Sequence, residues 1–201
     1  MRKIENRLTL VQACLVLALG AMPVAAGNSL VAPGTHAKVA HSSLSAKPMA
    51  EWNRLSRVDG KNVEVWTIDG DSLNKVSFYG GIASGKPLLR EADKKRDPLP
   101  KVSATMLMTD IPALLESTYR SLHLVDQMEI GDQTPALLGG HKAIRFSYAL
   151  TSSGDEVRRN GEAIGALVNG KLFLVTYEAP ALHFFDKDIE KYRQLADSLS
   201  F

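Results

Sequence analysis

The pattern of apolar and polar residues predicts β-strands over much of the chain. Residues 62–68 and 143–150 alternate with period two, which is typical of half-buried strands. The apolar face of the second stretch consists of Ile144, Phe146, Tyr148 and Leu150. Residues 172–177 are apolar on both faces, so we expect this strand at the centre of a covered sheet. Shorter apolar runs at residues 76–79 and 105–108 predict two further strands.

The clearest local motif is a β-hairpin around Asn169 and Gly170. Both residues accept a positive φ, as a type I′ turn requires, and both neighbouring stretches are apolar. The strand before the turn is expected over residues 156–168, with a bulge at Gly161. The sequence therefore predicts two antiparallel strands that meet at this turn.

Two amphipathic helices complete the pattern. One begins at Thr109 or Asp110, tolerates Pro112 in its first turn and has an apolar face made of Ile111, Leu114, Leu115, Tyr119 and Leu122. The other is expected to begin near Asp186, which caps it. Its apolar positions are Phe185, Ile189, Tyr192, Ala196 and Leu199. Each helix is expected to pack flat against an apolar surface.

These elements predict an α+β fold with one twisted antiparallel sheet of about five to seven strands and helices packed on it. Residues 50–201 are expected to form this single domain. Residues 27–49 are small and polar without apolar periodicity, which predicts a flexible leader. Residues 80–100 combine glycine, proline and a charge run, which predicts a long surface excursion.

The order of the later elements resembles the PsbP-like α/β/α domains. The resemblance rests on a capped helix over residues 110–122, a strand that ends in Glu178-Ala179-Pro180, and a C-terminal helix that runs into Leu195-Ala196-Asp197-Ser198-Leu199. It covers residues 50–201 in element order. The resemblance implies an α/β/α sandwich and a non-enzymatic role in docking onto or assisting membrane-associated assemblies, and it implies no site residues.

The first 26 residues have the pattern of a secretory signal peptide. Basic residues precede an apolar run over residues 8–22, and small residues follow at positions 23–26. We therefore expect cleavage between Ala26 and Gly27, and a periplasmic or secreted protein with no transmembrane span after cleavage.

Two alternatives to cleavage stay open. Lipid attachment at Cys14 fits less well, because Gln12 stands where a small or apolar residue is needed and the apolar run continues past the cysteine. A retained membrane anchor would need about 20 predominantly apolar residues. The run is interrupted by Thr9, Gln12, Gly20 and Pro23.

Removal of the signal peptide would change the charge and the thiol content. The chain has 24 Lys and Arg against 22 Asp and Glu, and the first 26 residues hold three of these bases and one acid, which leaves 21 of each. A formally neutral chain lacks the basic surface of a nucleic-acid binder, so no DNA or RNA partner is expected. Cys14, the only cysteine, would also be lost, which excludes disulfides, cysteine nucleophiles and cysteine metal ligands.

The sequence contains no complete motif for catalysis, metal or cofactor binding. Residues 80–86 superficially match a phosphate-binding loop, but Pro87 stands where a hydroxyl residue would bind Mg²⁺. His123, His141 and His183 do not lie in or near a Gly-x-Ser-x-Gly motif, and neither metal-ligand spacing nor a calcium loop is present. We therefore expect no catalytic residue, metal or cofactor.

One charged run offers a candidate binding cluster, Lys94, Lys95 and Arg96. Such cations contribute about 1 kcal/mol each near an anionic surface, so they could bind headgroups or an acidic partner. Interleaved acids offset much of this attraction, and a solvated loop is the alternative interpretation.

Other bulky residues have structural interpretations. Arg158 and Arg159 point to opposite sides of a strand, and one of them is expected to be buried or partnered, with Glu162 as a candidate partner. Trp52 and Trp66 are expected to be core anchors.

The sequence thus favours a non-enzymatic, exported accessory or binding protein of the cell envelope, with a possible protein partner there. The alternative is a small-ligand binder or hydrolase with a pocket that the sequence does not spell out. A deep pocket lined by His183, Arg145 or Tyr177 would favour this alternative.

Overall fold

The computed structural model describes residues 27–122, 124–154 and 156–201. In chain order the elements are β1 (Ser29–Val31), β2 (Ala37–Lys38), β3 (Ser45–Ala46), β4 (Trp52–Arg54), β5 (Val63–Thr67), β6 (Lys75–Ala83), the 3₁₀ helix η1 (Met108–Asp110), α1 (Ile111–Ser121), β7 (Val125–Leu138), β8 (His141–Ser152), β9 (Arg158–Val168), β10 (Lys171–Pro180) and α2 (Phe184–Asp197). The signal peptide prediction, with Cys14 and Ala26, and His123 lie outside the described residues.

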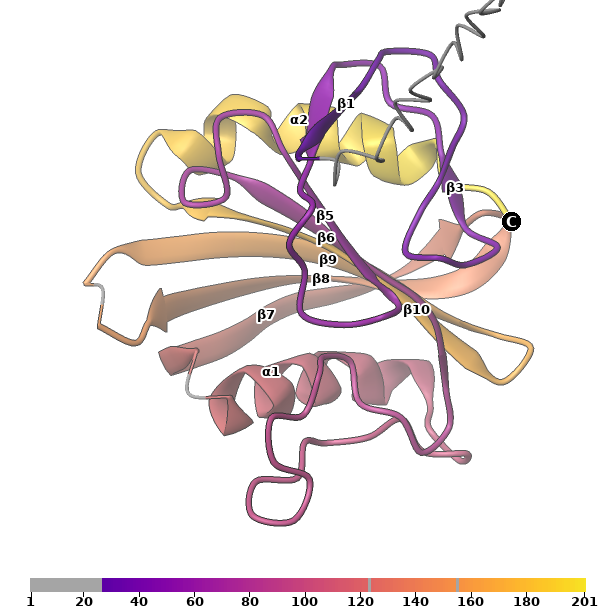
Figure 1. Ribbon diagram of the computed structural model, residues 1–201, viewed down its shortest axis with the longest axis vertical. Coiled ribbons are helices and arrows are strands. Elements are labelled where there is room, and N and C mark those ends of the chain that lie inside the picture. Colours follow the sequence, from indigo (N-terminus) through magenta and orange to yellow (C-terminus); the bar gives the residue numbers. More distant parts are fainter. Residues whose placement is uncertain (1–26, 123, 155) are drawn as a thin grey trace, which may run out of the picture.

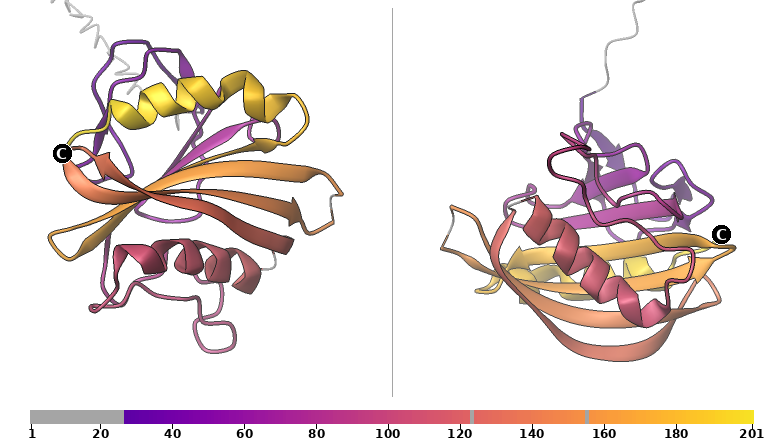
Figure 2. Two further views of the ribbon diagram at one scale, coloured as in Figure 1. Left: turned by 180° about the vertical axis from the view of Figure 1, so that it is seen from behind. Right: turned by 90° about the horizontal axis from the view of Figure 1, so that it is seen from below.

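One antiparallel sheet forms the middle of the molecule. Its strand order is β1-β4-β5-β6-β10-β9-β8-β7, and β2 pairs with β3 in a separate hairpin. The sheet twists between two helices, α1 on one side and α2 on the other (Figures 1 and 2). We call these sides the α1 face and the α2 face. The predicted α+β sandwich is confirmed, although the sheet has one strand more than the largest number expected.

The central strand β10 supplies side chains to both faces. Leu172 and Leu174 pack in the α1-face core, whereas Phe173 and Val175 pack in the α2-face core. This arrangement confirms the prediction that the strand lies inside a covered sheet. The turn before it is also as predicted, because Asn169 has φ 51° and Gly170 has φ 71°.

The helices bury the expected faces but begin differently. In α1, Ile111, Leu114, Leu115 and Tyr119 are buried. The Asp110 carboxylate does not cap this helix; it accepts a hydrogen bond of 2.8 Å from the Leu107 amide and closes η1. Helix α2 begins two residues before the predicted cap, so Asp186 lies in its first turn.

Residues 27–49 are part of the fold, not a flexible leader. β1 pairs with β4, and Val39, Ala40 and Leu44 in and around the β2–β3 hairpin are fully buried on the α2 face. The hairpin approaches the sheet closely at Gly80, where a side chain would collide with Ala40 and the hairpin turn. The apolar residues are few and sit around a tight turn, so they show no periodicity in the sequence.

Three other expectations about strands are wrong. Residues 105–107 form the end of a turn and a short connection, and η1 begins at Met108, so no strand forms over residues 105–108. Pairing of β9 with both neighbours is regular at Gly161, so there is no bulge; the glycine is needed because the Tyr148 ring covers its Cα, where a Cβ would overlap the ring. β6 runs on to Ala83, so the predicted excursion starts later and is held down by buried Leu88 and Leu99.

Candidate functional site

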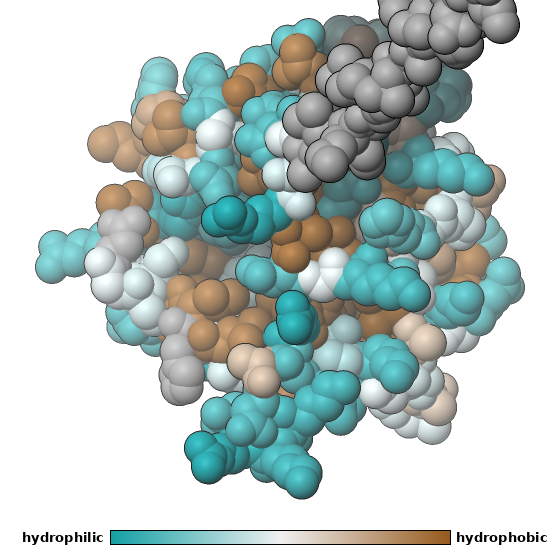
Figure 3. All heavy atoms as spheres, in the orientation of Figure 1, coloured by the Kyte–Doolittle hydropathy of each residue, from teal (hydrophilic) through white to brown (hydrophobic). Residues whose placement is uncertain are grey.

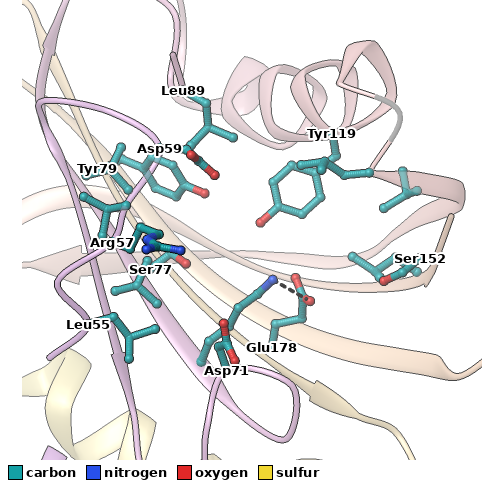
Figure 4. A pocket seen from close by; sticks show the side chains of 17 residues that line it. Leu55, Arg57, Asp59, Asp71, Ser77, Tyr79, Leu89, Tyr119, Ser152 and Glu178 are labelled. Atoms are coloured by element: carbon teal, nitrogen blue, oxygen red, sulfur yellow. Dashed lines mark ion pairs between the residues drawn. The ribbon is translucent and has the colours of Figure 1, made fainter. Parts of the chain in front are cut away.

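A cavity of about 410 Å³ lies on the α1 face, between α1 and the strands β5, β6 and β10 (Figure 4). Its wall is mostly apolar and includes Val63, Val65, Leu89, Leu124 and Leu150. Polar and charged side chains reach the same space: Arg57, Asp59, Asp71, Lys75, Ser77, Tyr79, Tyr119, Ser152 and Glu178. A concave, largely apolar space with a few convergent polar groups is the usual form of a small-molecule site.

Strand pairing explains why these polar side chains converge. Lys75 of β6 lies opposite Glu178 of β10, and Ser77 of the same strand lies opposite Val65 of β5. Since alternate residues of a strand share a face, Tyr79 lies on the same side as Lys75 and Ser77. Helix α1, which covers this face of the sheet, adds Tyr119.

Glu178 is the most unusual of these groups, because it is a carboxylate with only 2% of its surface exposed. Its Oε1 accepts a hydrogen bond of 2.9 Å from Arg159 Nε and lies 3.1 Å from Lys75 Nζ. Its Oε2 and Arg159 Nη2 are buried and have no hydrogen-bond partner in the described protein. Buried polar groups are nearly always partnered, and an unpartnered one costs about 1–3 kcal/mol. The carboxylate thus keeps one buried acceptor that no described group uses.

Two tyrosines supply hydroxyl groups next to this carboxylate. Figure 4 shows the hydroxyls of Tyr79 and Tyr119 pointing toward each other above Glu178. Burial raises the pKa of Tyr79 to about 12, and burial together with the charges of Tyr79 and Glu178 raises the pKa of Tyr119 well above its usual value. Both phenols therefore stay protonated at neutral pH and can donate hydrogen bonds.

A second, wider hollow of about 700 Å³ lies on the surface near residues 84–101. It is lined by five cations, Lys61, Lys86, Arg90, Lys94 and Lys101, and by one acid, Glu91. We call it the basic hollow. Lys101 Nζ lies 3.8 Å from the Glu91 carboxylate, whereas the other four cations form no ion pair with any described residue. Their charges remain available to an anion.

A third hollow of about 410 Å³, which we call the lip, adjoins both of these. Its lining shares Asp59, Leu89 and Leu124 with the cavity. It shares Arg90 and Glu91 with the basic hollow. The cavity and the basic hollow also share Val58, so each of the three hollows borders the other two.

The predicted cluster Lys94, Lys95 and Arg96 is only partly brought to this surface. Lys94 lines the basic hollow, while Lys95 and Arg96 are exposed on the same loop and line none of the three hollows. Their backbone amides both donate to Asp93 Oδ1, and Arg96 Nε lies 3.9 Å from the Asp93 carboxylate. The cations that accompany Lys94 come from other parts of the chain.

The residues named for an alternative pocket do not come together. Tyr177 is buried in the α2-face core, Arg145 pairs with Glu162 at 2.8 Å, and His183 is exposed before α2. Of the two consecutive arginines, Arg158 and Arg159, one was predicted to be buried or partnered, and this is Arg159. It pairs with Glu178 and not with Glu162.

Sequence reasoning missed Glu178, Lys75, Tyr79 and Tyr119 as site residues. One signal was present: Glu178 follows a run of apolar residues in a strand predicted to be covered on both faces, and a charge there must be paired or functional. Its partner Lys75 lies about a hundred positions away in the sequence, and the two meet only through the pairing of β6 with β10.

The described part of the chain has neither a metal-binding cluster nor a membrane-spanning helix. Over residues 27–122, 124–154 and 156–201, no group of three or more His, Cys, Asp or Glu side chains is placed to hold a metal ion. No helix in those same ranges is long and apolar enough to cross a membrane.

The fold is an α/β/α sandwich with a cavity on one face, and several solved structures are similar to it. No protein-family model and no curated protein matches the chain. Cyanobacterial PsbP (CyanoP) from Synechocystis sp. PCC 6803 is 18% identical with a TM-score of 0.46, over 83% of this chain and 96% of that chain. LpqN, involved in cell envelope biogenesis of Mycobacterium tuberculosis, is 12% identical with a TM-score of 0.34, over 90% of this chain and 86% of that chain.

A third similar structure is TplEi, an immunity protein of T6SS from Pseudomonas aeruginosa. It is 10% identical with a TM-score of 0.40, over 75% of this chain, and the match spans only 44% of the immunity protein. The sequence resembles the PsbP-like domains, and the similarity to CyanoP supports the same fold. At these TM-scores none of the three likenesses carries an argument about function.

Proposed function

We propose that this chain is an exported, non-enzymatic binding protein that holds a small, largely apolar molecule with a hydroxyl group in the α1-face cavity. The observation that carries the proposal is Glu178 Oε2, a buried acceptor without a partner beside an apolar-walled space. Export rests on the signal peptide predicted from the sequence.

The chemistry of the cavity selects for a neutral hydroxyl. Lys75 and Arg159 both pair with the Glu178 carboxylate, so a further cation is disfavoured beside this residue. A hydroxyl can donate to Glu178 Oε2 and accept a hydrogen bond from Tyr79 or Tyr119. The apolar remainder of the ligand would then be covered by Val63, Leu89 and the other apolar wall residues.

A binding role is favoured over hydrolysis by the types of residue in the cavity. Ser77 and Ser152 line it, but its described lining contains neither histidine nor cysteine. A serine nucleophile needs a base within hydrogen-bond reach, and Lys75 is engaged by Glu178. The other possible bases in the lining, Asp59 and Asp71, form no hydrogen bond with Ser77 or Ser152, so neither serine has a base beside it among the described residues.

The test compares decanol with methyl nonyl ether, which has the same number of heavy atoms but no donor. Binding is followed by amide chemical shifts of the protein from residue 27 onward. Decanol is expected to bind about tenfold more tightly, since one satisfied hydrogen bond to a charged group contributes about 1.5 kcal/mol. The shifted amides should lie in β5, β6 and β10.

Matched tyrosine variants serve as the control. Tyr119→Phe removes a cavity hydroxyl and should weaken decanol binding several-fold, whereas Tyr192→Phe, which alters a phenol that donates to Val175 O in the α2-face core, should leave it unchanged. Equal binding of alcohol and ether, or equal effects of the two substitutions, would show that the cavity does not recognise a hydroxyl.

A further inference from the structure

The cavity, the lip and the basic hollow border one another on the protein. Consecutive hollows share lining residues, with Leu89 and Leu124 between the cavity and the lip and Arg90 between the lip and the basic hollow. In the orientation of Figure 3, apolar residues are visible in the middle of the face and hydrophilic side chains cover the loop beneath α1. The polarity therefore changes along this path, from apolar to cationic.

The charge at the outer end is concentrated. The chain after residue 26 is formally neutral, with 21 bases and 21 acids, yet the basic hollow has five cations and one acid. The acid, Glu91, is itself occupied: its Oε1 accepts a hydrogen bond from the Leu99 amide, and Lys101 lies beside it. The other acids that line the cavity or the lip are Asp59, Asp71 and Glu178, and none of these three lines the basic hollow. The cations outnumber these acids and dominate the potential of the hollow.

We infer that the ligand of this protein is an anionic amphiphile with a hydroxylated chain. Its hydroxyl lies at Glu178 in the cavity, its apolar chain passes Leu89 and Leu124, and its anionic headgroup lies among Lys61, Lys86, Arg90 and Lys94. This inference rests on the proposed function and extends it, because it adds the headgroup and its charge.

Three probes separate the parts of this ligand, all used below their micelle-forming concentrations: ω-hydroxydecanoate, which has both polar ends, decanol, which has only the hydroxyl, and decanoate, which has only the anion. ω-Hydroxydecanoate is expected to bind at least tenfold more tightly than either partial probe. Its advantage over decanol should shrink at high salt, because exposed charges are screened by ions.

The double variant Lys86→Gln/Lys94→Gln tests the headgroup site directly. It should weaken ω-hydroxydecanoate binding by roughly tenfold to thirtyfold, given about 1 kcal/mol per cation, and should leave decanol binding unchanged. The control is Lys38→Gln/Lys142→Gln, which removes two exposed lysines that line none of the three hollows. This control should bind all three probes as the unaltered protein does.

The outcomes distinguish the two proposals. If decanol and ω-hydroxydecanoate bind equally well, the headgroup inference is wrong while the hydroxyl-binding function stands. If decanoate and ω-hydroxydecanoate bind equally well and both respond to the lysine variant, the headgroup site stands and recognition of the hydroxyl fails. If none of the probes binds, both proposals are overturned.

Discussion

All five tyrosines of the chain are withdrawn from water, and burial raises the pKa of each phenol. Three of them, Tyr79, Tyr119 and Tyr148, lie on the α1 face, and Tyr177 and Tyr192 stack on the α2 face with ring centroids 5.4 Å apart. The pKa of Tyr79 rises from 10.0 to about 12. Ionisation of any of these phenols would place a negative charge in an apolar core, so the folded protein resists it.

Because the tyrosines are buried, the free energy of unfolding depends on pH in the alkaline range. Above pH 10 the unfolded chain loses phenolic protons that the folded chain keeps, so the stabilisation is complete below the unfolded pKa and is lost as pH rises toward the folded pKa of about 12. At about pH 11, the native protein should show almost no tyrosinate absorbance, and all five phenols should ionise together when far-ultraviolet circular dichroism reports unfolding. Gradual ionisation near pH 10 with the fold intact would contradict the burial described here.

The ion pair of Glu178 and Arg159 is a second feature of single residues, and its burial does not by itself stabilise the folded protein. A buried pair loses hydration that its mutual attraction only partly restores, and apolar replacements are often neutral or stabilising. The pair in this protein leaves Glu178 Oε2 and Arg159 Nη2 without partners, which adds to the cost. Packing alone does not explain why these two buried atoms are unpartnered. A binding site for a polar group of a ligand does explain it.

At the scale of elements, the sequence predicted those parts whose pattern is local. The Asn169-Gly170 turn, the alternation in β8 and the two apolar faces of β10 depend on neighbouring residues, and all three are confirmed. β7 was missed because it is an edge strand whose exposed residues interrupt any apolar pattern. The cavity depends on which strands pair, and the pairing of β6 with β10 across a long separation leaves no local mark in the sequence.

The N-terminal segment with β1, β2 and β3 shows how a sparse pattern can still form core. Leu44 is fully buried in the α2-face core with Val39 and Ala46, although serines, lysines and a histidine surround these residues in the sequence. The segment also joins the C-terminus, because Ser45 and Ser200 form a β-bridge with reciprocal backbone hydrogen bonds of 2.7 and 3.0 Å. It therefore closes the fold next to α2.

Two leucine-to-alanine substitutions in this segment test its role. Leu44→Ala should destabilise the protein by about 2–5 kcal/mol, as expected for a buried leucine, whereas Leu30→Ala, at a position that is 68% exposed, should change stability by less than about 0.5 kcal/mol. Urea unfolding of both variants measures the difference. Two equally small effects would mean that the segment behaves as the flexible leader that its composition suggested.

The whole molecule has two apolar cores that are separated by one sheet. Trp52 and Trp66, the only tryptophans, both lie in the α2-face core, while α1 covers the other core. β8, β9 and β10 send alternate residues into each core, so neither core can be lost while these strands keep their packing on the other side. The two cores are therefore expected to unfold in one cooperative step.

Matched leucines in the two helices test this coupling. Leu115 in α1 and Leu195 in α2 are both fully buried, on opposite faces. Tryptophan fluorescence reports only the α2-face core. Leu115→Ala should nevertheless lower the urea midpoint of the fluorescence transition, as Leu195→Ala does. Each substitution should reduce the free energy of unfolding by about 2–5 kcal/mol. If Leu115→Ala leaves the fluorescence transition in place while circular dichroism shows an earlier loss of structure, the α1 face unfolds by itself. The cavity would then lie in a locally unstable part of the molecule, and a ligand bound there would stabilise that part alone.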